Sequence, residues 1–457
     1  MNKLDYFFNP KSIAVIGASR NPTKIGHVVF RNFLEGNFSG KLFPINPKTR
    51  ELFNTKCYSS VLSVKEKIDL AIITVPAALV AKVLTDCGKK KIHAVIIITA
   101  GFKEIGNVKE EEKLKEILKK YKMRCIGVNC LGVYDPYSKV DTFFLPPYKL
   151  RRPFEGNISF ISQSGALGSV VMDWMATKGY KISKFVSYGN ATDVDESDLI
   201  EYLGNDEKTK VICAYFEGIN KGRKFFEISK KVSKKKPIIA LKGGTTEEGT
   251  KSVASHTGSL AGSTDVIHAA FKQAGVVLAN DLEQIFDFAR VLSTQPLPKG
   301  NRVQIITDGG GFGVLTTDWV VKNGLKLAKM KKENLDKIKK VSPPYVVLKN
   351  PIDLTGDTDT ERYRVAIDAA IIDPNVDMIA LIVLFQVPQL TTDVVDVISE
   401  AVRNSDKPII IISAGGGYTE VLKKSLEEND VPCFSYPERA VESMRALYEY
   451  SKNNNKR

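Results

Sequence analysis

The chain has 457 residues, of which 43% are apolar, and its formal net charge is +14 at pH 7. This length leaves room for about three domains of ordinary size. The sequence has no apolar run of about 18 residues, as a membrane-spanning helix would need, and its first residues lack the apolar core of a signal peptide. We therefore expect no membrane association.

The positive charge by itself would favour a nucleic-acid partner. The lysines, however, occur in short runs mixed with glutamate, such as 89–91 and 234–236, and no aromatic residues alternate with them. We interpret these runs as a solvated basic surface, and we expect no nucleic-acid partner.

The six cysteines include no C-x-x-C pair, and the four histidines have no metal-ligand spacing. Cysteines without such a framework are typical of reduced, mostly buried thiols. The sequence therefore predicts a cytoplasmic protein whose chain supplies no metal site.

A first domain is predicted over residues 1–130, because apolar strands alternate there with helical segments. The expected strands lie at 12–19, where the strand runs into a glycine turn, and at 41–46, 70–76 and 94–99. Continuous Ile/Val strands separated by helices are typical of a buried parallel sheet of the Rossmann type.

The ligand of this domain is indicated by the turn after its first strand. A dinucleotide site has G-x-G-x-x-G in this turn and an acidic residue after the second strand. Here Gly17 is followed by no glycine until Gly26, and Lys48 stands where NAD would require a carboxylate. These two features exclude an NAD-dependent dehydrogenase. The polar, basic loop 19–26 suits phosphate groups instead. Coenzyme A fits this description, although a purely structural turn is the alternative for Gly17 alone.

The rest of the chain contains two similar stretches. Residues 160–168 resemble residues 305–313, and this alignment also superimposes the two tryptophans of the chain, Trp174 and Trp319. Further strands and helices follow in the same order in both halves, with a join near the proline-rich segment 296–300. We interpret the halves as a duplication, with chance similarity between α/β units as the alternative.

Each half is predicted to form a flavodoxin-like α/β domain, the first at 150–295 and the second at 300–457. The fold class is therefore α/β, with a Rossmann-type CoA-binding domain followed by two flavodoxin-like domains. Each repeat places a strand, a turn of small residues and a helix N-terminus in sequence. Such an N-terminus carries about half a positive charge and several free N–H groups, so two facing each other would hold a phosphoryl group.

The two repeats differ in one segment. After its Pro-Ile-Ile strand the first repeat continues into a Gly/Ser/Thr-rich stretch, 243–263, whereas the second passes almost directly from 415–417 into a helix. A polar loop of this length is usually functional. It contains His256, and imidazole is a good nucleophile at neutral pH. We therefore predict His256 as a phosphorylated nucleophile, with a structural histidine as the alternative.

A phosphohistidine needs its second ring nitrogen oriented, normally by a carboxylate. Glu217 follows the strand 211–216, at the carboxyl edge where sites of α/β proteins lie. We predict that Glu217 has this role, and a residue that merely caps the loop is the alternative.

No nucleotide-binding element is recognisable. The stretch 244–252 resembles a P-loop, but Thr250 is inserted before the lysine, so the spacing is wrong.

Four motifs together resemble the α subunit of archaeal ADP-forming acetyl-CoA synthetases, within the succinyl-CoA synthetase superfamily. They are Ile-Gly-Ala-Ser at 16–19, Ile-Ser-Gln-Ser-Gly-Ala-Leu-Gly at 161–168, Ser-His-Thr-Gly-Ser-Leu-Ala-Gly at 255–262, and Asn-Pro-Ile-Asp-Leu-Thr-Gly at 350–356. The resemblance covers essentially the whole chain, and the motif with His256 is its most specific part.

The resemblance implies the reaction of acyl-CoA, phosphate and ADP to an organic acid, CoA and ATP, through an acyl phosphate and a phosphohistidine. It implies a CoA site at Gly17, Ser19, Lys24, Lys48, Pro76 and Asn129. It also implies two phosphate-binding helix N-termini, at Ser164 and Gly165 and at Gly310 and Gly311. The loop of Asn129 departs from the family, which often has Gly-Pro-Asn, because Val128 replaces the proline.

No nucleotide site is recognisable in this chain. The resemblance therefore implies a separate β subunit with an ATP-grasp fold that binds Mg-ADP or Mg-ATP, in an α2β2 assembly. The preferred acyl group and the choice between ADP and GDP stay open. The alternative function is a CoA-binding sensor or scaffold without turnover, which would not need the histidine segment.

Overall fold

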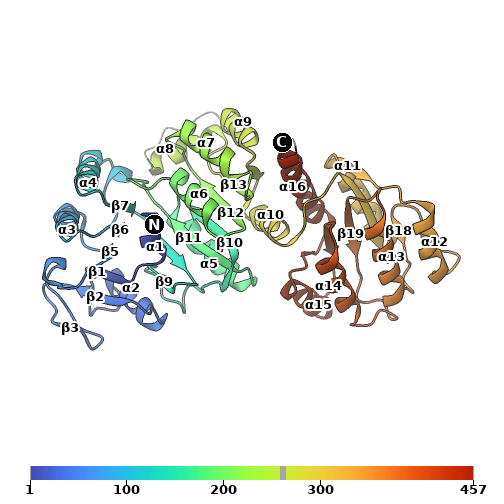
Figure 1. Ribbon diagram of the computed structural model, residues 1–457, viewed down its shortest axis with the longest axis horizontal. Helices are drawn as coiled ribbons and strands as arrows, with labels where there is room; N and C mark the ends of the chain where they lie inside the picture. The colour runs from blue at the N-terminus through green and yellow to red at the C-terminus, as the bar shows by residue number, and fades with distance from the viewer. Residues whose placement is uncertain (1, 258–263, 456–457) are drawn as a thin grey trace. The chain divides into compact units, whose positions relative to one another are not determined.

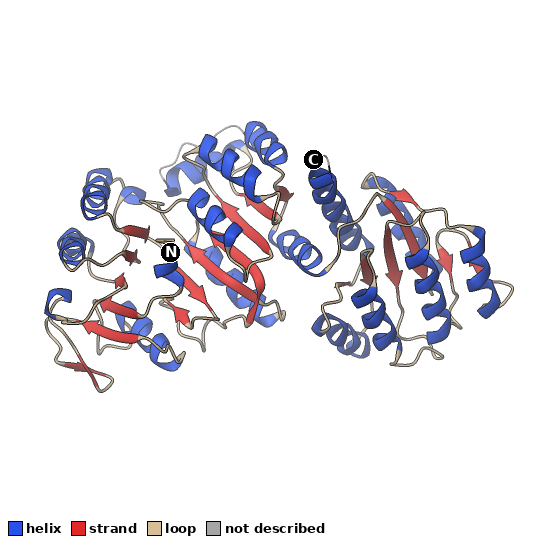
Figure 2. Ribbon diagram, in the orientation of Figure 1, coloured by secondary structure: helices blue, strands red, loops and turns tan. Residues whose placement is uncertain are grey.

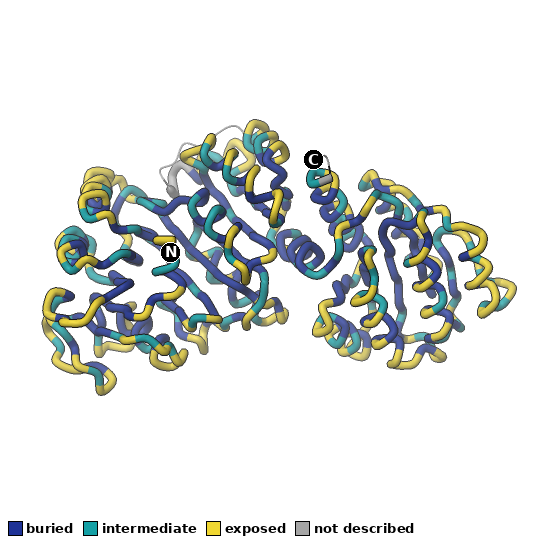
Figure 3. Tube along the Cα trace, in the orientation of Figure 1, coloured by how far each residue is buried: buried dark blue, intermediate teal, exposed yellow. Residues whose placement is uncertain are grey.

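The computed structural model describes residues 2–257 and 264–455, without the side chains of 254–257 and 455. The chain divides into two compact units, Met1–Leu278 and Ala279–Arg457. In both units strands alternate with helices, as Figures 1 and 2 show. The strands form buried sheets, and the exposed residues gather on the outer faces of the helices and in loops (Figure 3).

The first sheet has five parallel strands in the order β2-β1-β5-β6-β7. Its elements in chain order are α1 (Asp5–Phe8), β1 (Ser12–Ile16), α2 (Ile25–Glu35), β2 (Lys41–Ile45), the hairpin strands β3 (Glu51–Leu52) and β4 (Thr55–Lys56), the 3-10 helix η1 (Val61–Ser63), β5 (Leu70–Ile73), α3 (Ala77–Lys89), β6 (Ala94–Ile97), the 3-10 helix η2 (Lys103–Ile105), α4 (Val108–Tyr121) and β7 (Arg124–Gly127).

Four of these strands were predicted. Every residue of β1, β5 and β6 is buried, as expected for apolar strands with helices on both faces. The strand β7 was not predicted, because Arg124 and Gly127 leave only two apolar residues between them.

The second sheet has seven strands in the order β14-β13-β12-β10-β11-β8-β9. Its parallel part contains β10 to β13, and β8 and β9 extend it in antiparallel fashion beyond β11. Its elements are β8 (Gly132–Asp135), β9 (Val140–Asp141), β10 (Glu155–Ser162), α5 (Gly165–Thr177), β11 (Ile182–Ser187), α6 (Glu196–Asn205), β12 (Val211–Phe216), α7 (Gly222–Val232), β13 (Ile238–Lys242), α8 (Glu247–Thr257), α9 (Thr264–Ala274) and β14 (Val277–Ala279).

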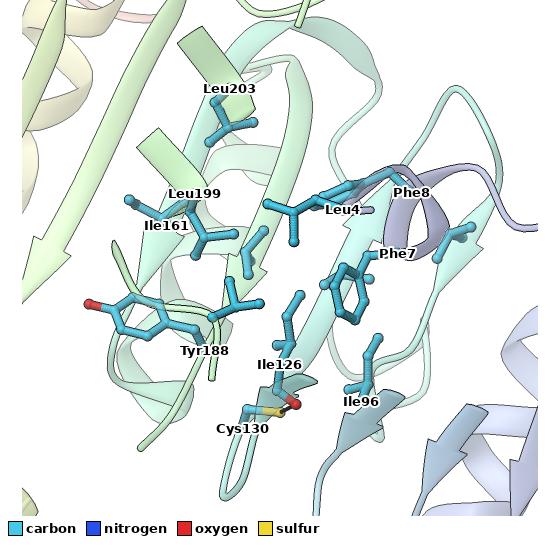
Figure 4. Close-up of a cluster of buried hydrophobic side chains, with 14 of the residues drawn as sticks. Leu4, Phe7, Phe8, Ile96, Ile126, Cys130, Ile161, Tyr188, Leu199 and Leu203 are labelled. Carbon is cyan, nitrogen blue, oxygen red and sulfur yellow. Dashed lines mark hydrogen bonds between the residues drawn. The ribbon is translucent and has the colours of Figure 1, made fainter. Parts of the chain in front are cut away.

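The first two sheets share one hydrophobic core. Phe7 of α1 packs in the same buried cluster as Ile96 and Ile126 of the first sheet, Ile161 of the second sheet and Leu199 of α6 (Figure 4). A close-packed interior of this kind resists relative movement. The strand ends of the two sheets are therefore held in a defined relation to each other.

The second unit has another seven-stranded sheet, in the order β17-β18-β15-β19-β20-β21 with β16 also beside β15. Its elements are α10 (Leu282–Thr294), β15 (Arg302–Thr307), α11 (Gly310–Lys322), β16 (Lys326–Leu327), α12 (Lys332–Val341), β17 (Val347–Leu348), β18 (Ile352–Asp353), α13 (Thr360–Ile372), β19 (Met378–Ile382), α14 (Val394–Asn404), β20 (Ile409–Ile412), α15 (Gly417–Glu428), β21 (Cys433–Phe434) and α16 (Pro437–Asn455).

The two flavodoxin-like sheets have the same strand order. In the first the order is β11-β10-β12-β13-β14, and in the second it is β18-β15-β19-β20-β21, with the first parallel strand in second place. This is the doubly wound order of flavodoxin-like folds. The helices α5 and α11 follow β10 and β15 and begin at Gly165 and Gly310, in agreement with the predicted alignment. The predicted α/β fold class is confirmed.

The helix α10, which the sequence analysis assigns to the end of the first repeat, packs against α16 and is grouped with the second compact unit. Arg439 donates hydrogen bonds from Nε and Nη2 to the two carboxylate oxygens of Asp287, both at 2.6 Å. Gln284 bonds Glu442 at 3.1 Å. The first unit thus ends before this helix.

The six cysteines are all free and buried. Among the residues that the structure describes, no helix is long and apolar enough to cross a membrane.

Candidate active site

A cavity of about 1300 Å³ lies at the carboxyl ends of strands from both sheets of the first unit. Ligand sites of doubly wound folds lie at this edge of the sheet. The strand ends that line it are Gly17 after β1, Asn46 after β2, Thr74 after β5, Ile98 after β6, Asn129 after β7, Ser164 after β10, Gly189 after β11 and Glu217 after β12.

The glycine turn after β1 is required by close packing. Gly17 has φ +98°, and a Cβ atom there would lie 2.6 Å from the Thr74 Oγ1 atom. A Cβ at Gly26, in the first turn of α2, would lie 2.1 Å from the Gly17 carbonyl oxygen. The absence of side chains lets the strand, the turn and the helix meet, and it leaves the backbone of Gly17 accessible from the cavity.

The cavity has a basic rim. Lys24 is the N-cap residue of α2, and Lys48 follows β2 in a turn where its backbone N–H bonds the Asn46 Oδ1 atom at 2.8 Å. Asn46 in turn donates to the Ala18 carbonyl at 2.7 Å, which ties this turn to the glycine turn. Both lysines are exposed and line the cavity, so they can reach anionic groups of a ligand.

The six residues predicted for CoA binding all line this one cavity: Gly17, Ser19, Lys24, Lys48, Pro76 and Asn129. Its walls also carry apolar side chains, among them Leu79, Leu131 and Phe144. A basic rim with apolar walls fits a ligand that combines phosphates with a long, less polar arm, as CoA does.

Asn129 is held by a network that the sequence did not indicate. Its side-chain Nδ2 lies 3.4 Å from the Asn190 Oδ1 atom. Asn190 Nδ2 donates to Glu104 at 2.7 Å and to Glu111 at 2.9 Å. Burial acts to raise the pKa of Glu104, but hydrogen bonds from Gly101, Asn190 and neighbouring backbone groups hold this pKa below its usual value. Asn190 also lines the cavity.

The N-terminus of α5 opens into the same cavity. Ser164 is its N-cap residue, and the Ser164 Oγ atom accepts a hydrogen bond from the Leu167 N–H at 3.3 Å. Ser164 and Gly165 both line the cavity. The positive end of the helix therefore faces a space where an anion can bind.

Glu217 also lines this cavity, with only 6% of its surface exposed. Its backbone N–H donates to the Gln163 Oε1 atom at 2.7 Å, and the next backbone N–H, of Gly218, donates to the same oxygen at 3.0 Å. The Gln163 side chain thus caps the loop after β12.

The segment with His256 is partly helical, contrary to the predicted loop. Residues Glu247–Thr257 form α8, with Glu247 and Glu248 in its first turn, where negative charge stabilises a helix. The backbone of His256 belongs to this helix, and its side chain lies outside the described residues, as do all atoms of 258–263.

The helix α8 nevertheless has defined surroundings. It packs against η2, and Lys103 of η2 lines the cavity. The Thr264 hydroxyl donates to the Thr245 carbonyl at 3.0 Å, so the ends of the inserted segment are joined. The first and last residues of the inserted segment therefore lie close together, near the end of β13.

In the second unit Gly310 and Gly311 form the first turn of α11, after the N-cap residue Gly309. The Gly309 N–H donates to the Thr307 Oγ1 atom at 3.0 Å. Asp308 has the place of Gln163 in the repeat, and both its carboxylate oxygens accept from the Leu384 N–H, at 3.1 and 2.9 Å. Both repeats therefore cap the loop of the neighbouring strand in the same way.

No group of three or more His, Cys, Asp or Glu residues that could hold a metal ion occurs within the described residues.

Three family models match the chain in succession. A CoA binding domain matches residues 11–136, a succinyl-CoA ligase like flavodoxin domain matches 155–292, and a ligase-CoA domain matches 303–456.

Individual relatives match over nearly the whole chain. The subunit alpha of ADP-forming acetate–CoA ligase II from Pyrococcus furiosus is 43% identical over 456 residues, with 98% of both chains covered. The ADP-forming acetate–CoA ligase of Methanocaldococcus jannaschii is also 43% identical, over 98% of this chain and 63% of that protein.

A solved structure shows the same fold. The dinucleotide forming acetyl-coenzyme A synthetase 1 of Candidatus Korarchaeum cryptofilum, in complex with phosphate and ADP, has a TM-score of 0.93 and 40% identity, and the match covers 100% of this chain and 98% of that one. Together with the three domain matches, these similarities show that the chain belongs to the family of ADP-forming acetate–CoA ligase alpha subunits.

Proposed function

We propose that this chain is the α subunit of an ADP-forming acyl-CoA synthetase, which converts acyl-CoA, ADP and phosphate into an organic acid, CoA and ATP. The observation that carries the proposal is the single cavity shared by the basic glycine turn, the α5 N-terminus and Glu217. Family membership favours this function over a CoA-binding sensor without turnover.

CoA binds with its phosphates along the basic rim. Lys24 and Lys48 supply positive charge, and Gly17 and Ser19 supply a backbone that anionic oxygens can approach closely. Pro76 and Asn129 border the path from this rim to the α5 N-terminus. The thioester carbonyl then lies near Ser164 and Gly165.

The N-terminus of α5 holds inorganic phosphate beside this carbonyl. A phosphate oxygen attacks the carbonyl carbon, the carbon–sulfur bond breaks, and CoA leaves as its thiolate. The products of this step are an acyl phosphate and CoA. Helix dipole and N–H groups stabilise the charge that develops on the phosphate oxygens.

His256 receives the phosphoryl group. A ring nitrogen attacks phosphorus, the bond from phosphorus to the acyl oxygen breaks, and the organic acid leaves as a carboxylate. Glu217 orients the imidazole and compensates its positive charge. A terminal oxygen of ADP then takes the phosphoryl group from His256. The N-terminus of α11, at Gly310 and Gly311, serves as a second phosphate site.

The nucleotide binds as its magnesium complex to a separate β subunit with an ATP-grasp fold, and two copies of each subunit form the enzyme. We place the enzyme in the cytoplasm, where its six free cysteines stay reduced. The acid it forms is a small organic acid.

Labelling with radioactive phosphate tests the proposal. Acetyl-CoA plus labelled phosphate should label this chain, in the presence of its partner subunit, with the acid-labile, base-stable behaviour of phosphohistidine. His256→Asn should abolish labelling and turnover while CoA still binds. His268→Asn, in the following helix α9, is the matched control and should be labelled normally. Labelling of His256→Asn would refute the assignment.

A further inference from the structure

Gln163 lies directly before the N-cap residue of α5, between the end of β10 and the start of the helix. Its backbone N–H donates to the Tyr215 carbonyl at 3.2 Å, so the pairing of β10 with β12 extends to this residue. Gln163 is only 9% exposed, and it lines the cavity beside Ser164 and Gly165. The accessible part of its side chain therefore faces the cavity.

The orientation of the Gln163 amide is fixed by two hydrogen bonds. Its Oε1 atom accepts from the Glu217 N–H at 2.7 Å and from the Gly218 N–H at 3.0 Å. Of the two polar atoms of an amide, only the oxygen can accept from N–H donors. The positions of oxygen and nitrogen in this side chain can therefore not be exchanged, and both lone pairs of the oxygen are used.

The amide nitrogen of the same side chain has no such partner. Gln163 Nε2 carries two N–H groups, and none of the residues that the structure describes accepts a hydrogen bond from them. Unlike Gln295 Nε2, which is unpaired and fully enclosed, the Gln163 nitrogen keeps accessible surface. A polar group on a side chain that is nine-tenths buried normally has a hydrogen-bond partner. The unpaired nitrogen therefore points to a ligand in the cavity.

The second repeat shows that an amide is not needed to hold the neighbouring loop. Asp308 lies at the equivalent position, and both its carboxylate oxygens accept from the Leu384 N–H. An ionised carboxylate has no N–H group to donate. Because a carboxylate suffices to hold the loop, the N–H groups of Gln163 serve another purpose.

The surroundings of these N–H groups suit an anion with several oxygens. The first N–H groups of a helix have no partner within the helix. Gly165 and Ala166 form the start of α5, and both line the cavity. A Cβ atom at Gly165 would meet no atom closer than 3.6 Å, so the backbone is open to a ligand. Gln163 adds two N–H groups to a helix N-terminus that already favours phosphate.

We propose that Gln163 binds the phosphoryl group at the α5 N-terminus by donating hydrogen bonds from Nε2. This inference rests on the proposed function and deepens it, because it names a side chain of the phosphate site. The amide donates first to inorganic phosphate and then to the phosphoryl group of the acyl phosphate. It keeps both protons throughout and forms no covalent bond. Gln163 thus holds the loop of Glu217 with its oxygen and the substrate with its nitrogen.

Two variants of the complete enzyme, with its partner subunit, test this role. Gln163→Glu keeps an oxygen that accepts from the loop after β12, but it adds negative charge. Gln163→Met has a similar length and no charge, and it can hold neither the loop nor the anion. The loss of the N–H donor is the one change that the two variants share. In both, the KM for phosphate with acetyl-CoA and ADP should rise about tenfold or more, since a hydrogen bond to a charged group is lost.

Stability and CoA affinity separate this role from a structural one. Gln163→Glu should melt close to the wild-type temperature and bind CoA within about twofold of the wild-type affinity, because the loop stays capped. Gln163→Met should melt at a lower temperature. Gln295→Met is the matched control, since Gln295 is also buried and its Oε1 atom accepts from the Ile409 N–H at 3.0 Å, away from the cavity. This control should keep the wild-type KM for phosphate.

A wild-type KM for phosphate in Gln163→Met would overturn this inference, even if the KM rose in Gln163→Glu, because repulsion by the added charge would then explain the rise. Gln163→Leu takes the place of the Met variant if that chain does not fold. A wild-type KM in Gln163→Glu would also overturn the inference, because the loop alone would then account for Gln163. Both results leave the proposed function intact, whereas a wild-type enzyme that makes no ATP from acetyl-CoA, phosphate and ADP would overturn the proposed function itself.

Discussion

Asp308 and Gln163 lie at equivalent positions of the two repeats, but they differ in whether the side chain can ionise. Gln163 and Asp308 both accept hydrogen bonds from the loop after the adjacent strand, but only Asp308 can carry charge. Asp308 is 4% exposed, and its burial raises its pKa to about 6, although the hydrogen bond from Leu384 N–H opposes this shift. Burial of this carboxyl group therefore costs more free energy as the pH rises and the group ionises.

The first prediction concerns this pH dependence. A carboxyl whose folded pKa is raised contributes stability that is present below its unfolded pKa, about 4, and is lost as pH rises through about 6. Asp308→Asn has no such titration. The free energy of unfolding of the variant relative to wild type should therefore increase between about pH 4 and pH 7, by up to about 3 kcal/mol.

Denaturant unfolding followed by tryptophan fluorescence can measure this difference. The chain has two tryptophans, one in each compact unit, so replacing Trp174 by Phe leaves Trp319 to report on the unit that contains Asp308. If the free energies of unfolding of variant and wild type differ by the same amount from pH 4 to pH 7, ionisation of Asp308 does not destabilise the folded state, and the prediction is wrong.

At the scale of elements, the helices α5 and α11 are equivalent but differ in their caps. Ser164 caps α5 through its side chain, whereas Gly309 provides no side-chain cap for α11. Ser164 also lines the cavity. Its hydroxyl therefore stabilises the helix and lies where phosphate is proposed to bind.

Ser164→Ala should accordingly have two effects. Loss of the cap should lower the free energy of unfolding by about 1 kcal/mol. The KM for phosphate should rise about fivefold or more, because a loosened first turn orients its N–H groups less well. Asp281→Ala, which removes the cap of α10 at Gln284 N–H, is the control for stability alone. Equal KM values for phosphate in both variants would show that the α5 N-terminus does not bind phosphate.

At the scale of the whole molecule, the compact units do not coincide with the sequence repeats. The predicted middle domain, 150–295, includes α10, but α10 buries Ile285 and Phe286 within the second unit. Asp287 pairs with Arg439, and Arg290 pairs with Glu427. Asp287 is buried, so removal of Arg439 would leave its charge uncompensated.

This packing predicts the behaviour of fragments. The fragment 279–457 should fold with one cooperative thermal transition, whereas 300–457, cut at the predicted join, should lose the helix that covers α16 and should unfold at lower temperature or aggregate. Calorimetry and light scattering of the two fragments measure this. Equal melting temperatures would show that α10 belongs energetically to the first repeat, as the sequence suggested.

The sequence by itself determined much of this protein. Buried Ile/Val runs predict parallel strands because both faces of such a strand meet apolar helices, and β1, β5 and β6 are completely buried. The spacing of glycines and tryptophans predicts the repeat, since equivalent turns need equivalent small residues. The residues expected to bind CoA were implied by the family resemblance rather than by periodicity, and they line one cavity.

Only the tertiary structure decided which distant segments meet. Periodicity describes which face of an element is apolar, but it does not say which other element covers that face, and so the place of α10 against α16 could not be predicted. For the same reason the joining of two sheets around one core, with a single cavity at their edges, became visible only in the structure. Gln163 and Asn190 escaped detection because their hydrogen-bond partners are more distant in the sequence than any local pattern reaches.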